Sequence, residues 1–205
     1  GRSPSAVFCQ QLHTGRWIVF HEIIGKDMGA IRFAEILKRE IAKNKWDHLT
    51  MKFIGDPAGN QMAQVSEHTP FMMLRASGIS AYPAPSNDIS VRVEAVESVI
   101  NRMADGLPCL TVSPTCTSLI SGFEGGYQYK RMYYMGNERY EDKPDKNRFS
   151  HCHDALQYAF LGGGEGRRVM LGGQKQAVPT TVERVSNPFA RLKNRNSRMS
   201  RARSL

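Results

Sequence analysis

The chain has few cysteines and no long apolar run. Its four cysteines, Cys9, Cys109, Cys116 and Cys152, lack the Cys-x-x-Cys spacing of a zinc or redox motif. Four cysteines in 205 residues are too sparse for a disulfide framework, so we expect reduced thiols in a cytoplasmic protein. The sequence contains no stretch of about eighteen consecutive apolar residues, the length that a membrane-spanning helix needs. We therefore expect a soluble protein with no membrane partner.

A phosphate-binding loop is also missing. The glycines of 162–173 do not form the pattern G-x-x-x-x-G-K-[ST], and they follow an expected helix instead of a strand. Glycine enrichment without apolar periodicity indicates a flexible linker. The segment 184–205 holds seven basic residues and no acid, and so carries most of the net charge of +9. We expect a folded domain over 1–162 and a glycine-rich linker with a basic tail over 163–205.

Two acids occupy positions that suit metal chemistry. Residues 49–54 are rich in strand formers and run into a glycine-containing loop that begins with Asp56 and Pro57, which places a carboxylate at the end of a strand. Asp-Pro is also common in ordinary turns, and that interpretation stays open. Farther along, His151 and Asp154 are separated by three residues. On a helix they would share a face and could reach one metal ion.

Elements alternate along the chain in an α/β order. Period-2 patterns predict a strand pair at 5–11 and 16–24, and period-3.6 patterns predict helices at 29–44 and 88–105. The remaining elements expected are a helix at 70–77, strands at 79–83 and 107–112, and a short helix at 117–123. This order predicts a mixed sheet with helices on both faces.

Residues 127–140 alternate aromatic and polar side chains around a Gly-Asn pair, which predicts an additional β-hairpin. Its five tyrosines could stack on nucleic acid, and its cations could neutralise phosphates. The hairpin and the loop after it supply the candidate DNA-binding residues Lys130, Arg131, Arg139, Lys143, Lys146 and Arg148. The alternative is that the aromatics only cover a sheet edge and that the charged loop is merely solvated.

Taken in order, several short runs resemble the nuclease domain of the large terminase subunit of tailed bacteriophages, a member of the ribonuclease H-like superfamily. The resemblance covers about residues 1–162. It rests on residues 1–8, 55–59, 92–96, 114–116 and 150–156, of which the last run, Ser-His-Cys-His-Asp-Ala-Leu, is the most specific. It implies an α/β, ribonuclease H-like fold with a mixed central sheet, helices on both faces and the extra β-hairpin.

The resemblance also implies a site and a reaction. In this family three acids hold two divalent ions, Mg²⁺ or Mn²⁺: one acid in an Asp-x-Gly run on the first strand, one at the position of Asp56 and one at that of Asp154. His151 corresponds to a histidine that often assists. The implied activity is two-metal endonucleolytic cutting of concatemeric double-stranded viral DNA during genome packaging. The implied partners are the portal protein, the small terminase subunit and an ATPase domain in the full-length chain, in the host cell cytoplasm during infection.

One departure from the family pattern affects the site. If Gly1 is the glycine of the Asp-x-Gly run, the first acid falls two positions before the chain begins. We then expect a truncated N-terminal edge and impaired catalysis. Glu22 and Asp145 are the reserve candidates for a third carboxylate. Two alternatives stay open: a non-catalytic DNA-binding or portal-docking module, and a ribonuclease H-like junction resolvase or transposase.

Overall fold

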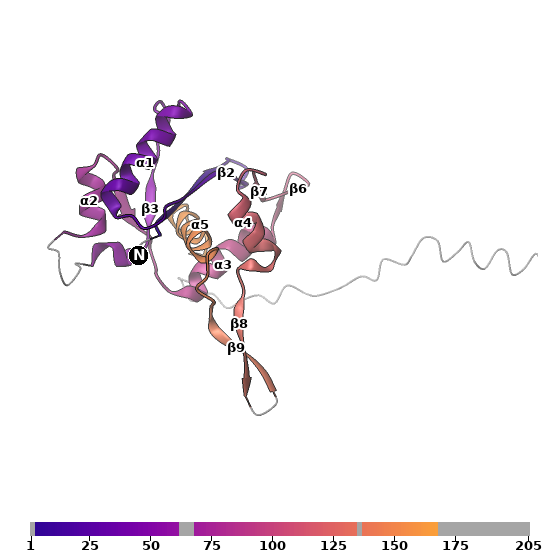
Figure 1. Cartoon of the computed structure of the whole chain (residues 1–205). Coiled ribbons are helices and arrows are strands. Elements are labelled where there is room, and N and C mark those ends of the chain that lie inside the picture. Colours follow the sequence, from indigo (N-terminus) through magenta and orange to yellow (C-terminus); the bar gives the residue numbers. More distant parts are fainter. Residues whose placement is uncertain (1–2, 62–67, 135–136, 168–205) are drawn as a thin grey trace, which may run out of the picture. The chain divides into compact units, whose positions relative to one another are not determined.

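The computed structural model describes residues 3–61, 68–134 and 137–167. Strands and helices alternate along these ranges, as the sequence predicts (Figure 1). The elements are β1 (Ser5–Gln11), β2 (Trp17–Ile24), α1 (Ala30–Lys43), β3 (Phe53–Gly55), the short helix η1 (Pro57–Asn60), α2 (Pro70–Ala76), β4 (Ala81–Pro83), α3 (Ile89–Ile100), β5 (Met103–Ala104), β6 (Leu107–Pro108), β7 (Leu110–Val112), α4 (Thr117–Ser121), the irregular turn η2 (Gly122–Gly126), β8 (Tyr129–Tyr134), β9 (Asn137–Pro144) and α5 (Ser150–Gly162).

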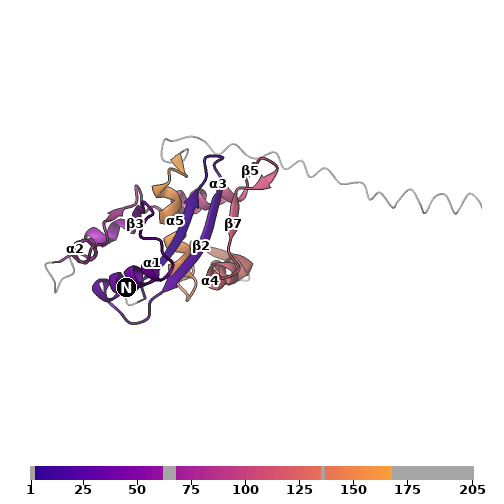
Figure 2. The same ribbon diagram turned by 90° about the horizontal axis from the view of Figure 1, so that it is seen from above.

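The largest sheet has the order β1-β2-β7, and its three strands lie side by side in Figure 2. β1 and β2 are antiparallel, with a register shift after Phe8, and β2 runs parallel to β7. A chain that holds both parallel and antiparallel pairs is a mixed α/β structure, which confirms the predicted fold class.

Two hydrophobic clusters cover the two faces of the β1–β2 pair. Trp17 and Val19 pack with buried side chains of α3, α4 and α5. Phe8 and Ile23 pack with buried side chains of α1. Because neighbouring residues of a strand point to opposite faces, one strand pair serves both clusters. Helices therefore lie on both faces of this sheet, as expected.

The strands do not join into one continuous sheet. β3 pairs in parallel only with β4, and it has no ladder to β1 among the described strands. A cavity of about 570 Å³ is lined by β1, by residues 49–55 and by small residues of α5, namely Ala155, Ala159, Gly162 and Gly163. The predicted central sheet is thus divided into two groups of paired strands, β1-β2-β7 and β3-β4. The helix α5 contacts β1 of the first group and β3 of the second.

The region after α3 differs from the expected helix at 88–105 and strand at 107–112. The helix ends at Ile100, and β5 and β6 form a small antiparallel hairpin. Asp105 and Gly106 make its turn, both with positive φ, which is the backbone that an Asp-Gly hairpin turn requires. The apolar residues of 88–105 have helical spacing, which favoured a longer helix, although the Asp105-Gly106 pair predicts a turn.

The hairpin predicted at 127–140 is present as β8 and β9, and it extends away from the other elements (Figure 1). It continues to Pro144, four residues beyond the expected end. The chain then enters α5. Just before this helix, the Asn147 side chain accepts from Phe149 N at 2.9 Å and donates to Gly126 O at 2.7 Å. These two bonds connect the start of α5 to the end of η2.

Glu165, three residues after the end of α5, bonds to residues of the core region. Glu165 is 9% exposed. It accepts hydrogen bonds from Trp17 Nε1 at 2.9 Å and from both terminal nitrogens of Arg102, at 2.8 and 3.1 Å. The first residues assigned to the linker are therefore held by buried polar contacts. Residues 168–205, with the basic tail, lie outside the described residues, and the division of the chain near residue 162 stays a prediction.

Candidate active site around Asp154

Asp56 directly follows β3 and caps the short helix η1. Its Oδ1 accepts from Ala58 N at 2.9 Å, and Pro57 occupies the first helical position, where its missing N–H costs nothing. The turn interpretation of Asp-Pro is therefore correct. A carboxylate that accepts one backbone bond keeps lone pairs for other partners, and Asp56 is exposed, so the turn does not exclude a second role.

Asp154 lies in the first half of α5, which confirms that the His-x-x-Asp run is helical. Two cations bind its carboxylate. Arg92 of α3 donates from a terminal nitrogen to Oδ1, and Lys146 donates to Oδ2 at 2.7 Å. The side chain of Asp154 is 16% exposed. Both oxygens of this carboxylate are therefore paired with a cation.

Tyr158 connects this carboxylate to Asp56. It lies one turn after Asp154 and is 4% exposed, and its hydroxyl donates to Asn87 Oδ1 at 2.6 Å. The Arg92 guanidinium carbon is 4.3 Å from the ring centroid. Burial raises the pKa of Tyr158 above its ordinary value; the charge of Arg92 opposes this shift, while the charges of Asp56 and Asp154 add to it. Tyr158 therefore contacts both Asn87 and the arginine that pairs with Asp154.

Asp56 and Asp154 are ligands of the kind that a hard divalent cation prefers. Two carboxylates alone are too few to fill the coordination shell of such a cation. Carboxylate oxygens are the ligands that Mg²⁺ and Mn²⁺ prefer, and Asp56 and Asp154 supply them from two different elements. Within the described ranges, no group of three or more His, Cys, Asp or Glu side chains could hold a metal ion. Any further ligands would have to come from elsewhere in the protein, from water or from substrate.

His151 and His153 have different environments. His151 is exposed, and its backbone carbonyl accepts from Ser5 Oγ at 2.6 Å; its assignment as a metal ligand stays a prediction. His153 is 3% exposed, stacks on Tyr127 at 4.6 Å and meets Phe123 edge-on at 4.7 Å. Desolvation lowers the pKa of His153, so this ring is neutral and structural.

Neither reserve acid joins the site in the described structure. Glu22 on β2 accepts from Ser118 N at 2.8 Å and Leu119 N at 3.0 Å. It thereby caps α4, whose own N-cap, Cys116, makes no side-chain bond. Asp145 is exposed, and its backbone N–H donates to Gln128 O at 2.9 Å. Both oxygens of Glu22 accept bonds from the start of α4, so this acid has a structural role there, and its use as a third carboxylate stays a prediction.

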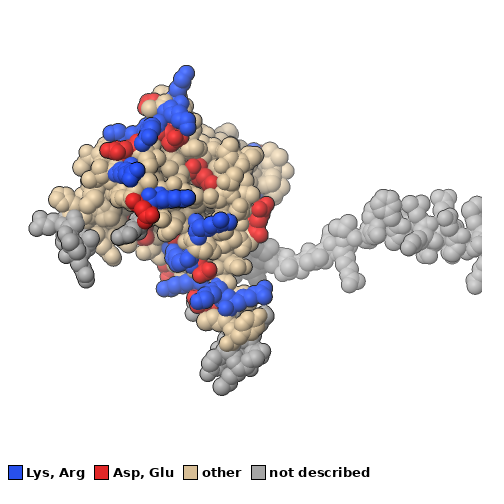
Figure 3. All heavy atoms as spheres, in the orientation of Figure 1, with Lys and Arg blue, Asp and Glu red and all other residues tan. Residues whose placement is uncertain are grey.

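The candidate DNA-binding residues are mostly on the hairpin, where Figure 3 shows Lys and Arg side chains gathered with some acids among them. Lys130 pairs with Glu141 at 3.6 Å, and the Arg131 guanidinium lies 5.9 Å from the Tyr140 ring centroid. Lys143 and Arg148 are exposed, Arg148 lies against Phe149, and the side chain of Arg139 lies outside the described part. Lys146 differs from this set because it contacts Asp154 directly.

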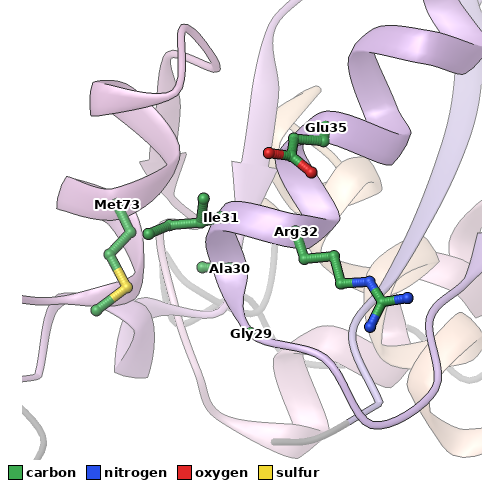
Figure 4. A pocket seen from close by; sticks show the side chains of 6 residues that line it. All are labelled: Gly29, Ala30, Ile31, Arg32, Glu35 and Met73. Carbon is green, nitrogen blue, oxygen red and sulfur yellow. The ribbon is translucent and has the colours of Figure 1, made fainter.

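A surface pocket of about 440 Å³ between α1 and α2 is separate from these residues. Figure 4 shows Ile31 and Met73 pointing toward each other across it, with Arg32 extending away. It shares no residue with the Asp56 and Asp154 region, and neither acid lines it.

Sequence reasoning missed the role of Arg92. The apolar stripe of α3 places Arg92 among Ala95, Val96 and Val99, all buried. A charged residue inside an apolar stripe has to find a buried partner, so this position was a usable signal. The identity of that partner, 62 residues away in the sequence, was not readable from the pattern.

The mixed sheet flanked by helices, with one acid after a strand and another on a packed helix, is an α/β arrangement. Among solved structures, the fold is similar to the nuclease domain of the large terminase from the bacteriophage SPP1, determined with bound Mn. The match covers 80% of this chain and 81% of that one, with a TM-score of 0.53 and 20% identity. The resemblance seen in the motifs is thereby confirmed at the level of the fold. No family model and no curated protein matches the sequence.

None of the helices in the described ranges is both long and apolar enough to cross a membrane.

Proposed function

We propose that this chain is the endonuclease domain of a viral genome-packaging terminase, which cuts concatemeric double-stranded DNA with the help of Mg²⁺ or Mn²⁺. The observation that supports the proposal most strongly is that Asp56 directly follows β3 while Asp154 lies on α5, the helix that contacts β3. This arrangement occurs within a fold similar to that of a terminase nuclease domain solved with Mn.

Each residue would have a limited task. Asp56 and Asp154 would hold the metal, with two ions proposed, and His151 would complete a ligand shell or relay a proton. When bound, the metals supply a Lewis acid and an activated water for phosphodiester hydrolysis. Lys130, Arg131, Arg139, Lys143 and Arg148 would bind phosphates. The portal protein, the small terminase subunit and an ATPase domain are the proposed partners, in the host cell cytoplasm.

The test is nicking of supercoiled plasmid with Mn²⁺ or Mg²⁺. It uses the chain as printed and a version carrying Asp two positions before Gly1, as the Asp-x-Gly run requires. We expect faster nicking by the extended version, and loss of nicking in its Asp56→Asn and Asp154→Asn variants while DNA binding persists. Asp105→Asn is the matched control, because Asp105 is exposed in the β5–β6 turn and Asn also tolerates its positive φ.

A non-catalytic DNA-binding or portal-docking module is the second candidate. It is favoured by the two cations that already neutralise Asp154 and by the missing third ligand among the described residues. No cleavage by the extended version with either metal, together with DNA binding, would support this alternative. Undiminished cleavage by Asp154→Asn would show that the site lies elsewhere.

A further inference from the structure

The two cations on Asp154 differ in how firmly they are held. The Arg92 side chain is 7% exposed and that of Lys146 is 70% exposed. Arg92 binds Oδ1 and Lys146 binds Oδ2. The carboxylate thus has one partner inside the protein and one in solvent.

Arg92 has contacts that keep it in place. Its guanidinium lies over the Tyr158 ring, and its Nε is buried without a hydrogen-bond partner among the described residues. Moving this group away from Asp154 would leave a buried charge unpaired, which is strongly unfavourable. The bond to Oδ1 is therefore a lasting feature of the folded domain.

The Lys146 side chain can move away from Asp154 with little loss of stability. Surface ion pairs contribute only about 0–1 kcal/mol. Asp154 is itself only 16% exposed, but it keeps its bond to Arg92 while water solvates the released Lys146 ammonium group. The neighbouring backbone is secured independently of Lys146, through the bonds of Asn147 to Gly126 and Phe149. The ammonium group can therefore swing into solvent without disturbing the start of α5.

We propose that Lys146 is a displaceable counter-ion on Oδ2 of Asp154, the oxygen that Arg92 does not bind, and that a divalent cation replaces it there. Arg92 is the positioning residue that keeps the carboxylate oriented through Oδ1. This inference rests on the proposed function and adds a regulatory step. A DNA phosphate that attracts Lys146 frees Oδ2, so DNA and metal bind cooperatively, because each removes a competitor of the other.

The test is calorimetric titration of the metal-free chain with Mn²⁺ in the absence of DNA. Lys146→Met should bind Mn²⁺ roughly two- to fivefold more tightly, the range of a lost exposed ion pair, with an unchanged melting temperature. Lys43→Met is the matched control: the Lys43 side chain is 69% exposed and also pairs with a carboxylate, that of Glu40 at 3.4 Å, and its removal should leave Mn²⁺ affinity the same. Equal or weaker Mn²⁺ binding by Lys146→Met would overturn the inference.

The test of Arg92 has to distinguish its role in positioning the Asp154 carboxylate from its contribution to the stability of the domain. Arg92→Lys keeps the charge but loses the planar group that stacks on Tyr158 and reaches Oδ1, so Mn²⁺ binding should weaken. Glu165→Gln, which breaks a different ion pair, should lower the melting temperature without changing Mn²⁺ affinity. Equal losses of Mn²⁺ affinity in both variants would reduce Arg92 to a structural residue.

The outcomes also distinguish this inference from the proposed function. If the unmodified chain binds Mn²⁺ and Asp154→Asn does not, but Lys146→Met matches the unmodified chain, the metal site stands and the counter-ion inference falls. If neither the chain as printed nor the version extended by the upstream Asp binds Mn²⁺, both fall.

Discussion

Asp154 illustrates how a carboxylate on a helix surface acquires a specific environment from one buried arginine. The helix places Asp154 and Tyr158 on the same face, one turn apart. Arg92 then contacts both, through an ion pair and through the ring face. Since removing one partner of a buried pair costs more than the pair contributes, the acid and the arginine are expected to tolerate substitution poorly.

Gly122 should not accept a side chain. A Cβ there would lie 1.9 Å from His153 Nε2, and the ring is confined by Tyr127 and Phe123. Alanine gains about 1 kcal/mol of helix propensity, but overpacking typically costs about 1–3 kcal/mol. We expect Gly122→Ala to lower the free energy of unfolding, measured with urea.

A double-mutant cycle provides the control for Gly122. In a His153→Ala background the clash is absent, so Gly122→Ala should cost less than it does in the unmodified chain. Full stability of the single variant would mean that the ring can move aside.

Glu165 should make stability depend on pH in the acid range. Burial raises the pKa of Glu165, but the hydrogen bonds from Arg102 and Trp17 and the charge of Arg102 outweigh it and hold the pKa below its ordinary value. A carboxyl with a lowered folded-state pKa stabilises above the unfolded value of about 4.3, and this contribution disappears as the pH falls through the folded-state pKa.

We therefore expect Glu165→Gln to lose about 1–3 kcal/mol at pH 7, with the difference from the unmodified chain shrinking below about pH 4. Thermal melts between those pH values measure it. A difference that stays constant with pH would mean that the charge of Glu165 does not contribute.

At the level of elements, the hairpin is nearly independent. β8 and β9 contact mainly each other, and its exposed aromatic side chains include Tyr133 at 72% and Tyr140 at 54%. A hairpin that adds little to the core can change without unfolding the domain, which suits a binding element.

Removing residues 131–140 and joining Lys130 to Glu141 through an Asn-Gly turn should leave the melting temperature nearly unchanged. DNA affinity should fall, and the salt dependence should become shallower by about two charges, from Arg131 and Arg139. Arg131→Gln with Arg139→Gln in the intact hairpin should reproduce the change in salt slope with a smaller loss of affinity, because stacking is retained. Unchanged affinity in the shortened chain would show that the hairpin does not bind DNA.

For the whole molecule, charge is concentrated outside the described domain. The tail 184–205 holds seven basic residues and no acid, so its composition predicts strong electrostatic attraction to DNA. Deleting it should weaken DNA binding and reduce the slope of log affinity against log salt by up to about six, while the melting temperature stays the same.

A chain of equal length with the seven basic residues replaced by Gln separates charge from length, and should behave like the deletion. A large loss of thermal stability on deletion would show instead that the tail packs on the core.

Local spacing alone was enough to predict several elements. The helix predicted at 29–44, the strand ending before Asp56 and the hairpin after Tyr127 follow from periods of 3.6 and 2 and from turn residues, which depend only on neighbours in the sequence. The ribonuclease H-like fold was implied by the resemblance of several short runs to the terminase nuclease domain, and the structural match supports that resemblance at the level of the fold.

Tertiary structure alone decided which side chains meet. Arg92 and Asp154, Glu22 and the start of α4, and Trp17 and Glu165 are pairs from distant parts of the chain. The gap between β1 and β3 likewise depends on how α5 packs beneath both strands. Sequence periodicity tells which face of an element is buried, but the partner on the other side is selected by packing and by the need to satisfy buried charge.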